Sequence, residues 1–198
     1  MARTFCTEQL LVELDAHERE ALLRIARASI HHGLANGRPL ELEAEALTGR
    51  LGEQRASFVS VHYQAQLRGC VGNLARQLPL AKDVARNAYQ AASQDSRFNA
   101  LTEAELPAAS IEVSVLSESR FIEVESEADL YRRLVPCEDG VILIEANRRA
   151  TFLPKVWEHL PHPADFIREL KFKAGLPADY WSDTLRFARY RATSFSDS

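Results

Sequence analysis

Two strand-like segments, 58–62 and 66–71, lie so close together in the sequence that only a tight turn can join them. A connection this short joins antiparallel strands, because parallel strands need a crossover of about a dozen residues or more. Further strand-like segments follow along the chain, with helical patterns between the pairs, at 111–116, 121–124, 141–145 and 185–191. This order predicts an α+β fold with a largely antiparallel sheet flanked by helices, and it disfavours a doubly wound parallel sheet.

The clearest helix start is at Asp15, which has the spacing of a capping box to Glu18. Apolar residues then recur at helical spacing until Asn36-Gly37, where the glycine favours a helix end. Further helices are predicted at 42–47, 80–94, 126–134 and 163–175. The segment 185–191 is predicted to be the last strand. A length of 198 residues leaves open whether the chain is one domain or a large lobe with a smaller one.

The composition is that of an ordinary soluble globular protein, with 46% hydrophobic and 26% charged residues. The formal net charge of −4 gives no general attraction for nucleic acid or for an anionic membrane, so neither is expected as a partner. No apolar run approaches the roughly 18 residues that a membrane-spanning helix needs.

The number and spacing of the cysteines indicate the cellular compartment. Cys6, Cys70 and Cys137 are odd in number and far apart, which disfavours a disulfide framework or a structural zinc site. Residues 1–15 lack the basic region and apolar core of a secretion signal. The protein is therefore expected in the cytoplasm, without a metal or another cofactor.

The segment Leu67–Gly72, which reads LRGCVG, is the signature segment of this chain. It places the thiol of Cys70 between two glycines and two residues after Arg68. Residues two apart in a strand project from the same face, so the Arg68 guanidinium is expected beside Cys70. A cation beside a thiol favours the reactive thiolate. Gly69 and Gly72 let another group approach the main chain closely. This combination predicts a functional site around Cys70.

The turn at Gln64-Ala65 decides which residues of the preceding strand face the signature segment. With a two-residue turn there, Val59 faces Cys70 and Val61 faces Arg68. Neither turn residue is glycine or asparagine, so this register depends on two unusual turn residues. A bulge beside the signature segment would change the face that Cys70 uses.

Two interpretations of Cys70 stay open. It is either a nucleophile or ligand-contacting thiolate, or a small buried residue packed on Val59, since free cysteine is among the most buried residue types. His62 pairs with Leu67 in the predicted register and lies on the face opposite Cys70. A cysteine–histidine couple would therefore need a bulge.

The arginines also allow two interpretations. A guanidinium binds carboxylate or phosphate in a bidentate manner, so Arg68 and Arg97 are candidates for anion binding. The alternative is a structural ion pair, and we favour a mixture in which Glu112 orients one of the two arginines. Gly69 and Gly72 are interpreted as backbone devices, because no phosphate-loop pattern accompanies them.

Seven segments of this chain occur in a recognisable order, at Phe58–Val61 (FVSV), Leu67–Gly72 (LRGCVG), Asp95–Phe98 (DSRF), Ile111–Leu116 (IEVSVL), Asp139–Leu143 (DGVIL), Thr151–Glu158 (TFLPKVWE) and Lys173–Pro177 (KAGLP). Together they resemble the AMMECR domain, also known as protein A of the AmmeMemoRadiSam system. The resemblance covers nearly the whole chain. It implies two unequal α+β lobes around antiparallel sheet, in agreement with the strand pairing above.

The resemblance implies partners and site residues but no particular reaction. Family members are typically encoded or fused with a radical-SAM protein and a Memo-type protein, which are therefore the implied partners. The site residues that it carries over are Arg68, Gly69, Cys70, Gly72, Arg97, Glu112 and Thr151. The chain departs from the family pattern at Ala56 and Ala150, where glycine is frequent, and at Lys171, where many members have a cysteine that could partner Cys70.

Two hypotheses follow for the function. In the first, the protein is a catalytic or substrate-presenting component that works with a radical-SAM enzyme and a Memo-like protein through a cleft at Arg68 and Cys70. Thr151 and Lys155 are expected to reach that cleft. In the second, it is a binding or adaptor domain that recognises an anionic group or a protein segment. A Cys70 exposed in a concave pocket, with Arg97 or Glu112 within hydrogen-bond reach, would favour the first hypothesis. A Cys70 buried under apolar neighbours, with an exposed apolar patch elsewhere, would favour the second.

Overall fold

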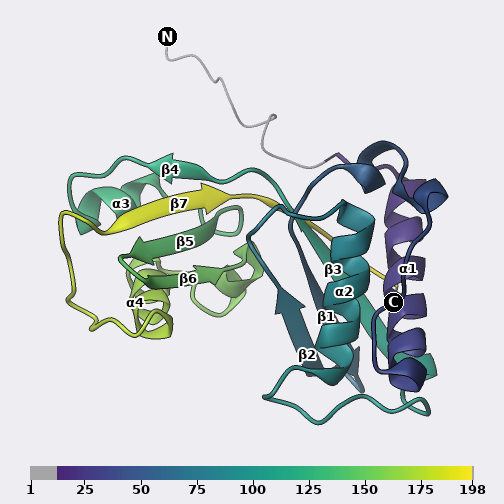
Figure 1. Ribbon diagram of the computed structural model, residues 1–198. Coiled ribbons are helices and arrows are strands. Elements are labelled where there is room, and N and C mark those ends of the chain that lie inside the picture. The colour runs from purple at the N-terminus through teal and green to yellow at the C-terminus, as the bar shows by residue number, and fades with distance from the viewer. Residues whose placement is uncertain (1–12, 198) are drawn as a thin grey trace. The chain divides into compact units, whose positions relative to one another are not determined.

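The computed structural model describes residues 13–197, which divide into two compact units (Figure 1). Within these residues, the larger unit comprises 13–116 and 193–197, and the smaller unit comprises 117–192. Each unit combines helices with a four-stranded antiparallel sheet, so the prediction of an α+β fold is confirmed. No helix within residues 13–197 has both the length and the apolar character needed to cross a membrane.

The larger unit packs two long helices on its sheet. Its elements are α1 (Ala16–Asn36), β1 (Ser57–Tyr63), β2 (Gln66–Gly72), α2 (Leu80–Ser93), β3 (Ala109–Leu116) and β8 (Ala192–Ser196), with 3₁₀ turns at Ala44–Leu47, Gly49–Gly52 and Leu106–Ala108. The strand order is β2-β1-β3-β8. Val59, Val61, Ile111 and Val113 alternate along β1 and β3, are fully buried, and share one core with both helices. The residues between them therefore point to the opposite face of the sheet.

The first helix begins where the capping box predicts. The Asp15 side chain accepts the backbone N–H of Glu18, and the Glu18 side chain accepts that of Asp15, both at 2.9 Å. The helix ends at Gly37, whose φ of 70° places it in the left-handed region. Both ends of α1 are thus determined by local sequence. The predicted helix at 42–47 is a short 3₁₀ turn instead.

The β1–β2 hairpin has the predicted two-residue turn but a different register. Gln64 and Ala65 have φ values of 51° and 60°, as a type I′ turn requires. The predicted pair of Val59 with Cys70 is wrong, because Cys70 pairs with Ser60. Arg68 has no partner in β1, since β2 carries one extra residue there, which forms a bulge. The bulge shifts all pairs beyond it by one residue.

The smaller unit packs two helices and a 3₁₀ segment on its sheet, whose strand order is β4-β7-β5-β6. Its elements are β4 (Arg120–Ile122), α3 (Glu127–Arg133), β5 (Gly140–Glu145), β6 (Arg148–Phe152), a 3₁₀ helix at Pro154–Glu158, α4 (Pro163–Lys173) and β7 (Arg186–Tyr190). Leu143 and Phe187 lie opposite each other in the sheet and are fully buried. The rings of Trp157 and Phe166 stack on each other in the same core, with centroids 3.8 Å apart.

The prediction that 185–191 is the last strand is wrong. β7 ends at Tyr190, and the following residues form β8, which joins the sheet of the larger unit beside β3. The hydroxyl groups of Ser114 and Ser194 lie 2.8 Å apart across these strands. The segment reads ATSFS and has a single large apolar residue, so its pattern indicates no buried strand. Its strand geometry depends on a partner about 80 residues earlier in the sequence.

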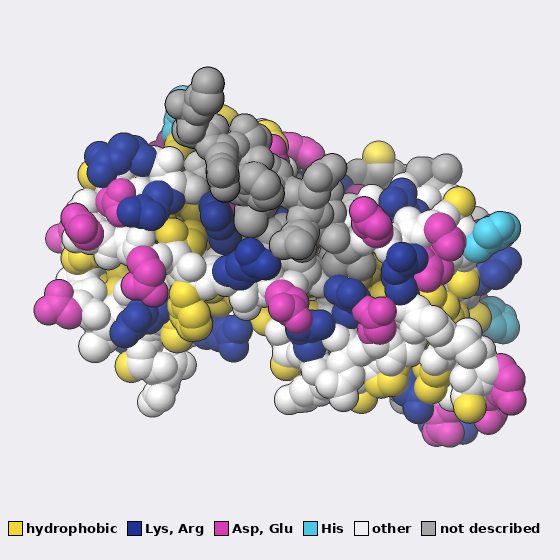
Figure 2. Space-filling view, turned by 90° about the horizontal axis from the view of Figure 1, so that it is seen from above, with side chains coloured by type: hydrophobic (Ala, Val, Ile, Leu, Met, Phe, Trp, Pro, Cys, Tyr) yellow, Lys and Arg dark blue, Asp and Glu magenta, His cyan; other side chains and the backbone are white. Residues whose placement is uncertain are grey.

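Charges of both signs are interspersed over the face shown in Figure 2. Lys and Arg side chains alternate there with Asp and Glu on both units, and no extended area is basic alone. A nucleic-acid-binding surface is typically a basic patch or stripe. The visible face therefore offers no such surface.

Candidate functional site

The two glycines of the signature segment allow close packing around β2. A side-chain carbon at Gly69 would overlap the backbone carbonyl of Ala91 in α2, and one at Gly72 would overlap the ring of Phe58. Gly69 therefore lets the helix lie directly on the strand, and Gly72 makes room for an aromatic ring in the neighbouring strand. Both glycines have structural roles, as the sequence interpretation favoured.

The backbone of Cys70 is held from outside the sheet. Its N–H donates to Asp95 Oδ2 at 2.9 Å, and its C=O accepts from Arg97 Nη2 at 3.2 Å. Both groups therefore point away from β1, and the Ser60–Cys70 pair is of the non-hydrogen-bonded kind, in which side chains lie closer together. The Cys70 side chain is only half-buried. It is neither sealed in the core nor fully exposed.

Asp95 and Arg97 form a bidentate ion pair beside Cys70. Arg97 Nε donates to Asp95 Oδ1 at 2.9 Å, and Nη2 donates to Oδ2 at 2.6 Å. The hydrogen bond from Arg97 is the main reason that the pKa of Asp95 lies far below its usual range. The pKa of Arg97 is raised, mainly by its hydrogen bond with Asp95 and also by the charge of that carboxylate. The Arg97 side chain is 60% exposed and lies over the Phe98 ring.

Arg68 is bound to the loop that follows α2. Its Nη1 lies 2.6 Å from Glu105 Oε1, and its Nη2 lies 3.5 Å from the carbonyl of Asn99. The guanidinium also lies 5.9 Å from the centroid of the Tyr63 ring. The hydrogen bond from Arg68 is the largest cause that lowers the pKa of Glu105 to about 2. Arg68 therefore fastens the bulge of β2 to this loop.

These contacts change the sequence interpretation of the arginines. Arg97, not Arg68, is the arginine whose guanidinium binds the backbone of Cys70. The carboxylates that bind the two arginines both come from the loop 94–108, whereas the sequence interpretation named Glu112. Glu112 lies in β3, two strands away from Cys70. The ion-pair alternative is thus observed, with different partners.

Three polar side chains form a row across the open face of this sheet. Cys70 in β2 lies opposite Ser60 in β1, and Ser60 lies opposite Glu112 in β3. Directly opposed residues share a face, and this face is the one turned away from the helices. His62 lies two residues after Ser60 in β1 and therefore on the same face. The bulge in β2 moves Cys70 onto this face as well, which is the shift that a cysteine–histidine couple needs. Within residues 13–197 no three His, Cys, Asp or Glu side chains are grouped as a metal site requires.

Thr151 and Lys155 belong to the smaller unit. Thr151, in β6, donates to the carbonyl of Val141 at 2.9 Å, and its hydroxyl lies 2.9 Å from that of Tyr190. Lys155 lies in the 3₁₀ helix that follows β6. That they share a cleft with Cys70 stays a prediction.

The positions that depart from the family pattern are all buried. Ala56 and Ala150 are 2% and 6% exposed. Lys171 is fully buried in α4, where its ammonium lies 2.6 Å from Glu127 and 2.9 Å from the carbonyl of Ala178. Lys171 therefore forms an ion pair within the smaller unit.

Sequence reasoning missed the roles of two acids. Asp95 was placed in a turn after the helix, and Glu105 was not singled out. The signal available for Asp95 was its spacing to Arg97, because an aspartate two residues before an arginine in a tight turn can bind it side-on. For Glu105 the local signal was its capping-box spacing to Thr102, whose N–H and hydroxyl donate to the Glu105 carboxylate at 2.8 and 2.9 Å. Its pairing with Arg68 has no local signal, since that arginine lies 37 residues earlier.

Comparison with known proteins defines the class of this protein. Residues 23–195 match the AMMECR1 family, so the chain belongs to that family. It is similar to protein MK0488 of Methanopyrus kandleri, with 32% identity over 177 residues that cover 85% of this chain and 83% of the relative. A protein of Thermococcus onnurineus is 32% identical over 189 residues, covering 90% and 89%.

The fold is also similar to that of a solved structure. The crystal structure of uncharacterized protein PH0010 from Pyrococcus horikoshii superposes with a TM-score of 0.83 and 27% identity. The match covers 89% of this chain and 90% of that one. The resemblance drawn from the sequence is thereby confirmed at the level of family and fold.

Proposed function

We propose that this AMMECR1-family protein presents Cys70 as a substrate-contacting thiol. In this proposal it is a catalytic or substrate-presenting component that acts in the cytoplasm with radical-SAM and Memo-like partners. One observation supports the role of Cys70. Its thiol is half-exposed, and its backbone N–H and C=O are both bound by the Asp95–Arg97 pair. The partners rest on the resemblance to the AMMECR domain.

The arrangement favours an anionic substrate group beside the thiol. Arg97 uses Nε and Nη2 for Asp95 and Cys70, and its Nη1 makes no hydrogen bond within the described residues. The side chain is mostly exposed, so Nη1 can donate to a carboxylate or phosphate from solvent. Asp95 already compensates most of the arginine charge, so the anion would be held by hydrogen bonding and geometry more than by net charge.

The other site residues divide into two groups in this proposal. Arg68, Gly69 and Gly72 are positioning residues, because each of them fixes β2 against its neighbours. Glu112, Thr151 and Lys155 are proposed ligand-binding residues. Ser60 joins them as the cross-strand neighbour of Cys70.

Alkylation of Cys70 tests the proposal. A variant with Cys6→Ser and Cys137→Ser leaves Cys70 as the single thiol. Iodoacetamide should modify it in the native protein faster than in the urea-denatured protein, and an anion bound at Arg97 should slow the reaction. Arg97→Gln should remove that protection. A native rate no faster than the denatured rate contradicts the catalytic role.

The partners need a separate experiment. The intact protein, with its bound small molecules retained, is captured from extract together with a radical-SAM or Memo-like protein and analysed by native mass spectrometry. A ligand whose retention depends on Arg97 and Cys70 would identify the substrate class. Capture of neither partner under conditions that preserve the fold contradicts the proposed assembly.

A second candidate function is a binding or adaptor domain without catalysis. It is favoured by the finding that both arginines are paired with carboxylates and both glycines serve packing, which gives most of the signature segment a structural explanation. Cys70→Ser separates the two functions. An adaptor retains its ligand or partner after this change, whereas a thiol-dependent component loses its activity.

A further inference from the structure

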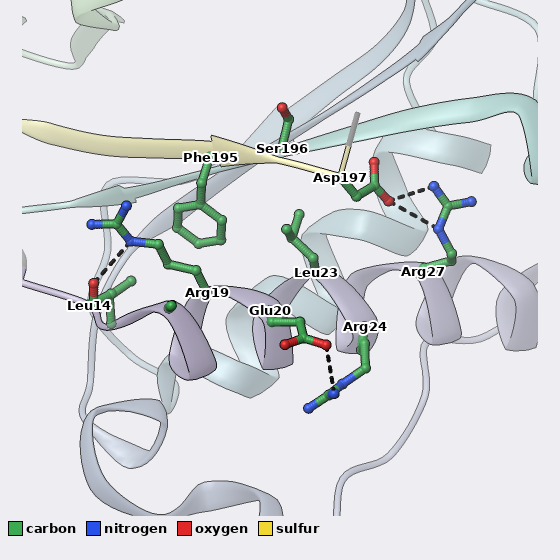
Figure 3. A pocket seen from close by; sticks show the side chains of 10 residues that line it. Leu14, Arg19, Glu20, Leu23, Arg24, Arg27, Phe195, Ser196 and Asp197 are labelled. Carbon is green, nitrogen blue, oxygen red and sulfur yellow. Dashed lines mark hydrogen bonds and ion pairs between the residues drawn. The ribbon is translucent and has the colours of Figure 1, made fainter.

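A groove between α1 and β8 lies in the same unit as Cys70 but is lined by other residues (Figure 3). It encloses about 670 Å³, within the range of small-molecule sites. The side chains of Leu14, Leu23 and Phe195 give it apolar walls. Nothing in the proposed role of Cys70 uses this groove.

One face of α1 supplies the polar groups of the groove. Arg19, Leu23 and Arg27 follow each other at intervals of four residues, so they lie on one face of the helix. Eight residues of helix span about 12 Å. Figure 3 shows Arg19 beside Phe195 at one end and Arg27 with Asp197 at the other end, with Leu23 between them. The groove is thus apolar in the middle, with one arginine at each end (Figure 3).

The arginine at one end is bound mainly by the protein itself. Arg27 Nε and Nη2 bind Asp197, Nη1 donates to the carbonyl of Leu106 at 2.8 Å, and Nη2 also donates to that of Ala109 at 2.7 Å. These bonds use four of its five N–H donors, and the carboxylate of Asp197 compensates its charge. This end therefore offers a ligand no uncompensated charge.

The arginine at the other end is not compensated. Arg19 donates from Nε to the carbonyl of Leu14 at 3.0 Å, and its guanidinium lies 6.0 Å from the centroid of the Phe195 ring. Arg24, the third arginine of the groove, is paired with Glu20. Among the described residues, Arg19 alone of these three has no carboxylate partner, so its two terminal nitrogens are available as donors.

From this arrangement we infer a binding site for a small amphiphilic monoanion, with its carboxylate on Arg19 and its alkyl chain along Leu23 and Phe195. A guanidinium whose Nε is already fixed is oriented in advance and pays less to bind a carboxylate. The apolar walls bury the chain, and the compensated Arg27–Asp197 pair limits its length. A neutral or cationic amphiphile lacks the group that Arg19 recognises.

Calorimetric titration with decanoate tests this site, with 1-decanol and decyltrimethylammonium as uncharged and cationic probes. Decanoate should bind, and the other two should bind at least about tenfold more weakly, because a hydrogen bond to a charged group is lost. Arg19→Gln should weaken decanoate by about tenfold, and Arg19→Lys should weaken it less. Arg38→Gln, outside the groove and paired with Glu41, is the control and should change nothing.

Several outcomes overturn the inference. Equal affinity for decanoate and 1-decanol would show a merely apolar surface. Unchanged decanoate affinity in Arg19→Gln, with an unchanged melting temperature, would place the ligand elsewhere. A dimer in sedimentation that Leu23→Glu dissociates and decanoate does not would assign the groove to a second copy of the chain.

Discussion

The carboxylate of Asp95 accepts the backbone N–H of Cys70, from a position 25 residues later in the sequence. Because β2 is the outer strand of its sheet, this N–H and the neighbouring C=O would otherwise be unpaired. Asp95 and Arg97 bind both groups, as an adjacent strand would. The pair thus ends the sheet at Cys70 without adding a strand that would cover the thiol, and exposed strand edges are otherwise prone to association.

Asp95→Asn should destabilise the outer edge of β2 at Cys70. The change keeps the size of the side chain but removes the ion pair and weakens the bond to Cys70. Since hydrogen bonds to charged groups contribute more than neutral ones, we expect unfolding in urea to require about 2 kcal/mol less. Asp165→Asn breaks an ion pair of the same 2.6 Å length on an exposed helix surface and should have little effect. Equal effects of the two variants would contradict a special role for Asp95.

Gly69→Ala adds one methyl group and should lower the unfolding free energy more than any other such addition in the signature segment. The added carbon would overlap the carbonyl of Ala91, so β2 and α2 must separate. We expect a loss of about 2 kcal/mol in unfolding free energy, as for overpacking of a core. Gly49→Ala is the control, because that position has φ of 55° but open space around it. Its cost should come from backbone strain alone, about 1 kcal/mol.

The Arg68–Glu105 pair should make stability depend on acid pH. The pKa of Glu105 is lowered to about 2, mainly by the hydrogen bond from Arg68 and further by those from Thr102, from an ordinary value of 4.5. Its stabilising contribution is therefore complete above pH 4.5 and is lost as the pH falls toward 2. The difference in melting temperature between the wild type and Arg68→Met should be largest above pH 5 and should shrink in that window. A difference that does not vary between pH 6 and 2.5 would show that Arg68 acts through packing alone.

Local signals in the sequence were sufficient for the elements that end in recognisable caps and turns. Asp15 and Glu18 set the start of α1, and the two residues at 64–65 gave the hairpin, although both adopt positive φ without being glycine. The bulge at Arg68 could not be predicted, because it depends on Glu105 in a loop 37 residues away. The α+β fold and the signature segment were predicted from the residues themselves, and the family resemblance agreed with both.

Part of the candidate site was named from the sequence, but the contacts between its residues were not. Cys70 and Arg97 were both named, yet the arginine assigned to the thiol was Arg68, because alternation in a regular strand places it two residues away on the same face. A single extra residue in β2 breaks that alternation. Asp95 acts on the backbone of Cys70 rather than on its side chain, and a sequence pattern of side chains does not reveal such a contact.

Lys171 and Glu127 provide a test of the smaller unit. The lysine is fully buried, while the glutamate side chain is 29% exposed, and their charged atoms lie 2.6 Å apart. Lys171→Met fills a similar volume but removes the ammonium from Glu127 and from the carbonyl of Ala178. We expect a loss of about 2 kcal/mol, because a partly buried carboxylate then loses its cationic partner.

A double-mutant cycle separates the ion pair from packing at Lys171. Glu127→Gln alone removes the negative charge but keeps an amide oxygen as acceptor, so the buried ammonium loses its counter-ion rather than its hydrogen bond. If the pair is the cause, Lys171→Met should cost much less in the Glu127→Gln background than in the wild type, with a coupling of about 1 kcal/mol or more. Additive losses in urea unfolding would instead show that the lysine stem, through its contacts in the core, stabilises α4 without the charge.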